Sequence, residues 1–352
     1  MQNRFTKRVN LTQKILQKIT QIEEFKGLWR GSLRLSPQTL GRLKRSVLIT
    51  SSGSSTRIEG SKMSDAEVAR LIRGLKSTPP KGRDEEEVAG YVDLLGRIFD
   101  HWKTLKITEG QILHFHKILL NFSKKDKIHK GRYKTSGNKV VMKKEDGEEI
   151  VIFEPTPPYL TKKEMDDVLF WLSEEMAKKE THPLIVIANF IFEFLAIHPF
   201  RDGNGRLSRA LTTLLLLKTG YTYVPYVSLD EIIEERKIDY YLALRKTQSR
   251  HKTKQEDIAP WLNFLLDALL EQIQRAKGIM EEDQPEKMLS EKQLAVYQLF
   301  QADALSVSEI SKLLKGSIPM ATIKQALSRL VDLKLIERLG MGRGSRYKKS
   351  SL

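Results

Sequence analysis

Residues 198–209 read HPFRDGNGRLSR, and they directly follow a nearly continuous apolar run from Leu184 to Ile197. The run Gly203-Asn204-Gly205 permits positive φ angles, so that successive backbone N–H groups can point into one concavity. The pattern after it predicts a helix from Arg206 to Lys218, stopped by Gly220. Free N–H groups and the positive dipole end at the start of a helix attract anions. The stretch therefore predicts an anion-binding loop between two helices.

The charged side chains of this stretch have the chemistry of a phosphate site. Arg206 and Arg209 are three residues apart and share one helix face. Two cations near a helix N-terminus are unfavourable unless an anion lies there, and a polyphosphate would satisfy loop, dipole and arginines together. Asp202 offers a hard oxygen ligand for Mg²⁺, and His198 is the one nearby side chain that ordinarily titrates near neutral pH, so it is the natural general base. Taken singly, each residue is more often part of an ordinary turn; the combination favours phosphate binding.

The same stretch resembles the signature of the Fic family, His-x-Phe-x-Asp/Glu-Gly-Asn-Gly-Arg-x-x-Arg, at every specified position. The resemblance extends over about residues 84–275. It includes Gly131-Arg132-Tyr133, which is similar to the start of the family's flap hairpin, and Phe153-Glu154-Pro155. Fic proteins are mostly adenylyltransferases, which move AMP from ATP to a Ser, Thr or Tyr hydroxyl of a protein and release pyrophosphate. The resemblance implies this activity and a mainly α fold, a Fic-type helical core with a small β-hairpin flap.

The resemblance also implies roles for individual residues. His198 would deprotonate the target hydroxyl, and Asp202 would hold Mg²⁺ between the α- and β-phosphates of ATP. Phosphate contacts are implied for five residues of the loop and helix start: Gly203, Asn204, Gly205, Arg206 and Arg209. The flap, about residues 135–141, would align the target backbone by strand addition. Tyr240 and Tyr241 lie where the family lines its nucleotide pocket, although an aromatic pair at this spacing is more often core.

A second motif precedes the Fic-like region. Ser55-Thr56-Arg57-Ile58-Glu59-Gly60 resembles the family's inhibitory motif, Ser/Thr-x-x-x-Glu-Gly/Asn, and its position implies a class II, N-terminally inhibited member. Glu59 would pair with Arg209 in a charge-assisted contact and so occupy the arginine that the γ-phosphate needs. The alternative is a surface carboxylate in a Ser-rich loop. Some inhibited members also remove AMP, and the sequence leaves open whether this one does.

The composition restricts the remaining possibilities. The chain has 352 residues, a net charge of +16 and no cysteine, which excludes disulfides, zinc fingers and thiol catalysis. Residues 1–83 carry 18 basic and 5 acidic side chains, residues 84–280 carry 30 of each, and residues 281–352 carry 12 and 9. The N-terminal excess indicates a docking surface for an acidic partner, protein or nucleic acid. No leader and no apolar run of about 20 residues is visible, so we expect a soluble, cytoplasmic protein.

The chain is expected to have three parts: an N-terminal helical region with the inhibitory motif over 1–83, a Fic catalytic domain over 84–280 and a winged-helix domain over 286–352. Within them, Ser51–Ser55 is predicted to interrupt the N-terminal helices, and Ser64 and Thr108 to cap helices. Further predictions are a hairpin around Gly137-Asn138, a helix capped by Thr161, and single helices over 230–249 and 257–279.

The C-terminal part has the pattern of a winged helix-turn-helix. Helices are predicted over 290–301, 307–315 and 320–333, followed by a glycine-rich hairpin over 336–347. Residues with nucleic-acid-binding chemistry fall on the third helix and the wing: Ala321, Thr322, Lys324, Gln325, Ser328, Arg329, Arg338, Arg343, Arg346, Lys348 and Lys349. DNA binding and protein contacts are about equally supported. A DNA-binding regulator whose Fic core senses nucleotide is therefore the alternative function. The partners left open are a target protein, the chain itself by self-modification, DNA and a homodimer, with no membrane.

Overall fold

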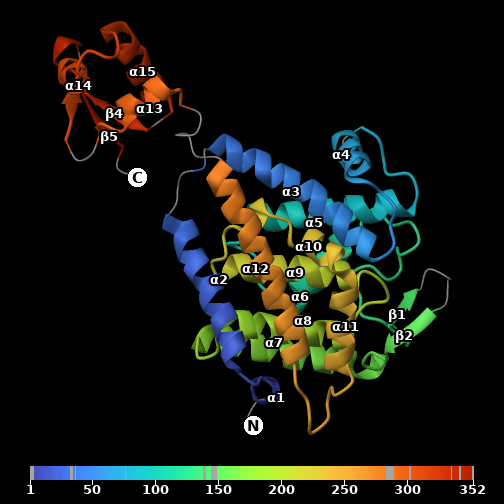
Figure 1. The fold of residues 1–352 in the computed structure, drawn as a ribbon. Coiled ribbons are helices and arrows are strands. Elements are labelled where there is room, and N and C mark those ends of the chain that lie inside the picture. The colour runs from blue at the N-terminus through green and yellow to red at the C-terminus, as the bar shows by residue number, and fades with distance from the viewer. Residues whose placement is uncertain are drawn as a thin grey trace. The chain divides into compact units, whose positions relative to one another are not determined.

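A computed structural model describes residues 4–31, 35, 37–75, 77–137, 140–143, 149–282, 289–300, 303–333, 335–340 and 342–350. The chain divides into two compact units, a larger one that includes Pro37–Ala276 and Met1–Gly31, and a smaller one that includes Lys277–Leu352 (Figure 1). The predicted boundary at residues 83 and 84 therefore lies inside the larger unit. Residues 283–288, next to the other predicted boundary, lie outside the described residues.

The larger unit is mainly helical, as predicted, with one small hairpin. Its helices are α1 (Arg4–Lys7), α2 (Gln13–Gly31), α3 (Pro37–Ile58), α4 (Asp65–Gly74), α5 (Arg83–His101), α6 (Glu109–Leu119), α7 (Pro158–Lys178), α8 (Pro183–Ile197), α9 (Asn204–Lys218), α10 (Leu229–Glu235), α11 (Lys237–Gln248) and α12 (Ala259–Glu282), with a short 3₁₀ turn at Val224–Tyr226. The last residues of α12, from Lys277 on, belong to the smaller unit. The hairpin consists of β1 (Val140–Lys143) and β2 (Glu149–Phe153). None of the described helices is long and apolar enough to cross a lipid bilayer.

The core is centred on α8 and α9. Every residue of α8 from Leu184 to Ile197 is buried, as expected for a helix that is apolar on all sides. Helix α7 packs on one side of α8 and α9 on the other, and Figure 1 shows α2, α3 and α12 outside them. Helix α9 begins at Asn204, two residues before the predicted start. The loop between these two central helices is therefore fixed at both ends by the most buried part of the molecule.

The Ser-rich stretch Ser51–Ser55 was predicted to interrupt the N-terminal helices, and this prediction is wrong. The stretch lies inside α3, which continues to Ile58, and its serines are buried. Small side chains allow α3 to pack closely on α5 and α10, and the Ser51 hydroxyl is hydrogen-bonded to that of Ser228 at 2.8 Å. Tertiary packing therefore outweighs the modest helix propensity of serine.

Several helix boundaries also differ from the prediction. Thr161 does not cap α7, because the helix begins at Pro158 and the Thr161 hydroxyl donates to the carbonyl of Pro157. The predicted helix over 230–249 is two helices, α10 and α11, which meet at Arg236. The predicted caps Ser64, in a capping box, and Thr108 are confirmed.

The hairpin uses a different turn from the predicted one. Strand β1 begins at Val140 and pairs antiparallel with β2, with Val141 opposite Val151 and Lys143 opposite Glu149. Residues 135–137, the first part of the predicted flap, form a bend before the strand, and Asn138 lies outside the described residues. Gly137-Asn138 is therefore not the turn between the two strands.

The smaller unit has its own core. It contains α13 (Glu291–Tyr297), α14 (Val307–Leu313) and α15 (Met320–Asp332), and a sheet in the order β3 (Leu305–Ser306), β5 (Arg346–Lys349), β4 (Ile336–Leu339). Its buried residues include Val296, Ile310, Ile323, Leu327 and Ile336. The three helices and the following hairpin come in the predicted order, strand β3 was not predicted, and the assignment as a winged helix stays a prediction.

Candidate active site

The loop between α8 and α9 is held in place by its own asparagine. Helix α8 ends with His198 at a φ of 49°, and Gly203 has a φ of 81° just before α9 begins. The buried Asn204 amide accepts from the Phe200 N–H at 2.9 Å and donates to the Phe200 carbonyl at 2.8 Å. The side-chain amide therefore closes the loop, and both its donor and its acceptor are used. The backbone N–H is the group of Asn204 that could bind a ligand.

A buried histidine of α6, which the sequence analysis did not identify, supports this loop. His116 of α6 is buried and stacks on the Phe200 ring at a centroid distance of 3.8 Å. Its Nδ1 accepts from the Gly131 N–H at 2.9 Å, so the proton lies on Nε2, which donates to the Asp202 carbonyl at 3.0 Å. Burial lowers the pKa of His116 to about 4, and the ring is therefore a neutral support near pH 7.

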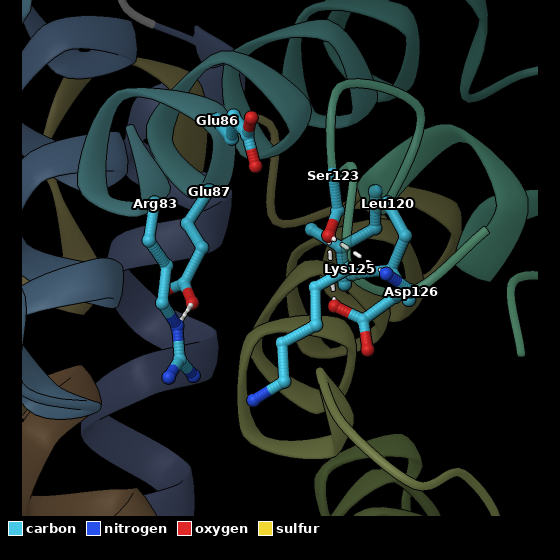
Figure 2. A pocket seen from close by; sticks show the side chains of 8 residues that line it. Arg83, Glu86, Glu87, Leu120, Ser123, Lys125 and Asp126 are labelled. Carbon is cyan, nitrogen blue, oxygen red and sulfur yellow. Dashed lines mark hydrogen bonds and ion pairs between the residues drawn. The ribbon is translucent and has the colours of Figure 1, made fainter. Parts of the chain in front are cut away.

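Arg206 lies in a closed ring of alternating charges. Its side chain is 1% exposed, with Nη1 3.2 Å from Glu87 Oε2 and Nη2 3.1 Å from Asp202 Oδ1. Arg83 completes the ring, 2.6 Å from Glu87 Oε1 and 3.7 Å from Asp202 Oδ2. Figure 2 shows Arg83 and Glu87 at a small cavity of about 70 Å³, which Glu86 and other residues also line. Arg206 therefore holds the loop carboxylate and does not extend into solvent.

The predicted metal ligand has suitable chemistry. The Asp202 side chain is one third exposed, and its Oδ1 accepts from the Gly203 N–H at 2.6 Å. Burial alone would raise its pKa, but the Arg206 guanidinium and the Gly203 N–H hold it below the usual value. An ionised, partly exposed oxygen beside a predicted phosphate loop fits Mg²⁺.

The predicted general base is in its neutral form. Burial lowers the pKa of His198 to about 4, and the nearby Lys134 adds to this, while the carboxylates of Glu59 and Asp202 act in the opposite direction. Phe153 at the end of β2 lies edge-on to the imidazole at a centroid distance of 6.2 Å. The hairpin therefore reaches the histidine, and a neutral imidazole can accept a proton at physiological pH.

Arg209 and the end of α3 meet at the start of α9. The Arg209 side chain is 4% exposed, and its Nη2 donates to Glu59 Oε1 and to the Ser55 carbonyl, at 2.8 Å and 2.7 Å. Its Nε donates to the Ser55 hydroxyl at 2.7 Å. Because the Glu59 N–H bonds to Thr56, the Ser55 carbonyl is one of the unpaired carbonyls that end a helix. We call the contacts of Arg209 with Ser55 and Glu59 the inhibitory contact, after the role that the sequence predicts for them.

The Glu59 carboxylate occupies the place where an anion would bind. A Cβ on Gly205 would overlap Glu59 Oε1 and would lie 3.3 Å from Arg209 Nη1, so the carboxylate lies directly over the first turn of α9. Arg209 Nη1 is buried and has no hydrogen-bond partner among the described residues. Despite burial, Glu59 and Asp230 keep the pKa of Arg209 raised. A charged donor next to a helix N-terminus is the arrangement that binds phosphate.

Two further contacts hold this region and were not foreseen. Arg57 donates to both carboxylate oxygens of Glu234 on α10, at 2.6 Å and 2.9 Å, and so fixes the last turn of α3. Asp230, also on α10, is buried, accepts from the Tyr91 hydroxyl at 2.9 Å and lies 3.6 Å from Arg209 Nε. These carboxylates are far from the motif in sequence, and no spacing could have identified them.

The two predicted nucleotide-pocket tyrosines differ in their surroundings. Tyr240 is buried and packs edge-on against Trp261 and Phe264, and burial raises its pKa to about 12. Its ring belongs to the core, while Tyr241 is only partly buried. The same helix carries Gln248, whose amide N and O are buried, without a partner among the described residues, beside a cleft of about 320 Å³ that Phe153 also lines.

A second carboxylate and histidine cluster lies away from the loop. The ligand atoms of Glu193, His251 and Glu256 lie within 4.8 Å of one another. The Arg8 guanidinium already pairs with both carboxylates, and Arg4 pairs with them as well. This cluster therefore joins α1 to α8, and its oxygens are compensated by arginine.

Comparisons with known proteins agree on one family. Residues 106–216 match the model of the Fic/DOC family. The chain is 25% identical over 233 residues to protein adenylyltransferase fic-1 of Caenorhabditis elegans, covering 64% of this chain and 40% of that protein. It is 27% identical over 239 residues to protein adenylyltransferase Fic of Drosophila persimilis, covering 67% and 42%. The chain thus spans about two fifths of the length of these relatives.

Solved structures show the same fold. A Fic family protein from Desulfovibrio desulfuricans G20 superposes with a TM-score of 0.63 at 25% identity, over 97% of this chain and 98% of that chain. A Fic domain containing signaling protein from Bacteroides thetaiotaomicron superposes with a TM-score of 0.61 at 23% identity, over 74% and 98%. The second likeness concerns the fold alone.

Proposed function

Because the chain contains a Fic domain, we propose that it transfers AMP from ATP to a hydroxyl side chain of a protein. One observation carries the proposal: His198, the start of α9 and the buried guanidinium of Arg209 meet at one place, where a carboxylate now lies in the position of an anion. The family's relatives named protein adenylyltransferase support the reaction class.

In the proposed reaction, the target hydroxyl oxygen attacks the α-phosphorus of ATP. Its proton passes to the neutral imidazole of His198, the bond to the β-phosphate oxygen breaks, and pyrophosphate leaves. The backbone N–H groups of Asn204 and Gly205 would hold the phosphates, because the predicted third donor, the Gly203 N–H, already donates to Asp202. Arg209 would orient the γ-phosphate through Nη1, its partnerless donor. Mg²⁺, when bound at Asp202, would neutralise phosphate charge. The Arg206 ring keeps that carboxylate ionised and in place.

Recognition of the base would involve α11. The orphan amide of Gln248 offers one donor and one acceptor, which is what an adenine edge requires, and Tyr241 lies on the same helix. The hairpin, whose Phe153 reaches His198, would present the target backbone by strand addition.

The inhibitory contact would keep the enzyme inactive. Glu59 occupies both the first turn of α9 and one guanidinium nitrogen of Arg209, so ATP would bind without its γ-phosphate in place. In the bifunctional form of this proposal, the same site would also remove AMP, with Glu59 positioning the water.

Mass spectrometry of wild type and Glu59→Gly after incubation with Mg²⁺–ATP tests the proposed function. An adduct of AMP less water, larger in the variant, is expected; no adduct in either protein argues against it.

DNA binding by the smaller unit is the second candidate function. The outer face of α15 exposes Lys324, Gln325, Ser328 and Arg329. On the wing, however, Arg346 pairs with Glu309 and Arg338 with the Ser345 hydroxyl, and the Arg343 side chain lies outside the described part. A gel shift of the full chain against duplex DNA at low and high salt tests it, with Lys324→Glu/Arg329→Glu as the variant. Equal retardation of both proteins contradicts the assignment to α15.

A further inference from the structure

Besides the candidate active site, a positively charged surface lies on the segment that leads into the hairpin. An open cleft of about 640 Å³ is lined by α6 and the 127–132 loop, and its cations are Lys117, Lys127, Lys130 and Arg132. None of its lining residues is acidic. The segment 84–280 has 30 basic and 30 acidic side chains, so this concentration of one sign is local.

The cations of this cleft have no carboxylate partner among the described residues. Acidic side chains on neighbouring segments have other partners: Glu109 pairs with Lys162, Glu87 with arginines, and Asp126 accepts a hydrogen bond from the Ser123 hydroxyl at 2.8 Å. Like charges held together without counter-ions raise the free energy of the free protein, and an anionic partner would lower it.

The cleft is joined directly to the candidate active site. The Gly131 N–H in its floor donates to His116, and the Lys134 N–H donates to the Pro199 carbonyl of the motif loop, both at 2.9 Å. Gly131 has a φ of 72°, and a Cβ there would lie 3.2 Å from the Leu113 carbonyl. A glycine is therefore needed for the loop to pack so closely on α6. The chain then continues from the cleft into β1.

We propose that this cleft, which we call the basic cleft, binds an acidic segment of the target protein close to the hydroxyl that is modified. The proposal rests on the proposed function and names its substrate class. The apolar part of the cleft is aliphatic, Leu113 together with Ile128, which is 76% exposed. Sites for single-stranded nucleic acid combine cations with aromatic rings for base stacking. Among the described residues, no Phe, Tyr or Trp lines this cleft, and His114 is its one imidazole. An acidic peptide with an aliphatic side chain fits both parts.

Fluorescence anisotropy with a labelled, Glu-rich peptide that contains one Leu tests the proposal on the full-length protein. The peptide should bind, and affinity should fall as salt rises. Lys127→Glu/Lys130→Glu should weaken binding at least about tenfold, because attraction becomes repulsion. Lys127→Gln/Lys130→Gln should weaken it less. The matched control is Lys106→Glu/Lys163→Glu, two exposed lysines outside the cleft, which should change affinity less than about twofold.

Three results would overturn the proposal: no binding, equal weakening by the control variant, or no change on reversal of Lys127 and Lys130. A single-stranded oligonucleotide of the same net charge is the second probe. Tighter binding of that probe through the same lysines would assign the cleft to nucleic acid instead. Because the measurement is binding at equilibrium, it gives an answer whether or not the protein transfers AMP, so the two proposals fail separately.

Discussion

Arg206 and Arg209 lie three residues apart on one helix, yet they are held in opposite ways. Arg206 is enclosed by Glu87 and Asp202, within a ring that α5 and the motif loop form together. Arg209 is equally buried, and each arginine has one carboxylate partner that is one third exposed: Asp202, in the same loop, for Arg206, and Glu59, which follows the last residue of α3, for Arg209. Arg206 is thus held from its own loop and from α5, whereas Arg209 is held by the end of a separate helix. In the proposed function the first set of contacts is permanent and a phosphate replaces the second, so the same residue type would support the fold at one position and bind ligand at the other.

The largest effect on AMP transfer is expected from changing His198, which leaves both arginines in place. His198→Ala in a Glu59→Gly background should lower AMP transfer by about a thousandfold, because general-base catalysis contributes roughly 10²–10⁴. ATP affinity, measured by calorimetry, should remain that of Glu59→Gly alone, since both arginines are unchanged. Transfer that survives the substitution would take the base role away from His198.

Breaking the permanent cluster should cost stability. Glu87→Ala leaves the buried Arg206 with one partner fewer, and loss of one member of a buried ion pair costs about 3 kcal/mol. Urea unfolding should show this decrease. The control is Asp93→Ala, which breaks the exposed pair with Arg97 and should cost less than about 1 kcal/mol. Equal losses would mean that the Arg206 ring is not a special support.

Breaking the exchangeable contact should raise activity. Glu59→Gly should increase transfer about tenfold, which corresponds to the roughly 1.5 kcal/mol of a charge-assisted hydrogen bond. Labelled ATP measures the change. Adding Arg209→Ala to this variant should remove the gain, because the γ-phosphate then loses its partner. Unchanged labelling in Glu59→Gly contradicts the inhibitory role.

A smaller gain is expected from loosening the end of α3 without touching Glu59. Arg57→Ala removes the paired bonds to Glu234 and should raise transfer by a few-fold, since part of the same contact energy is lost. Arg57→Lys keeps the positive charge but loses the bidentate geometry of the guanidinium. Its transfer activity should therefore lie between those of Arg57→Ala and wild type. Arg97→Ala, on α5, serves as the control and should leave transfer as it is. A loss of activity in Arg57→Ala would indicate a purely structural role.

The smallest effect concerns pH. With a pKa of about 4, His198 stays neutral as the pH falls from 8 to about 5.5, so transfer by Glu59→Gly should change by less than about a tenth. A histidine with the ordinary pKa would lose roughly tenfold over that range through protonation. Removing Glu59 also removes a carboxylate that raises this pKa, which favours the flat profile further. A steep decline above pH 5.5 would contradict the burial argument.

The contiguous part of the site was accessible from sequence, and the supporting part was not. The glycines, the helix start and the order of charges in 198–209 are local, so their geometry follows from short-range chemistry. His116, Glu87 and Asp230 come from α6, α5 and α10, and only the fold brings them to the loop. The Ser51–Ser55 error has the same origin, because burial against other helices decided its conformation. The partnerless amide of Gln248 likewise becomes visible only in three dimensions.

The burial of α3 limits how such a protein can be switched on. Ser51 to Ser55 form part of the interior, and the helix packs on α5 and α10. Cutting the chain ahead of the Fic-like region, by a protease or by shortening the gene, would therefore remove a wall of the domain together with Glu59, the proposed inhibitory residue. Truncations that remove α3 should therefore give an insoluble protein rather than a hyperactive one. Under the proposed function, activation therefore has to move the Glu59 carboxylate away from Arg209 and leave α3 in place.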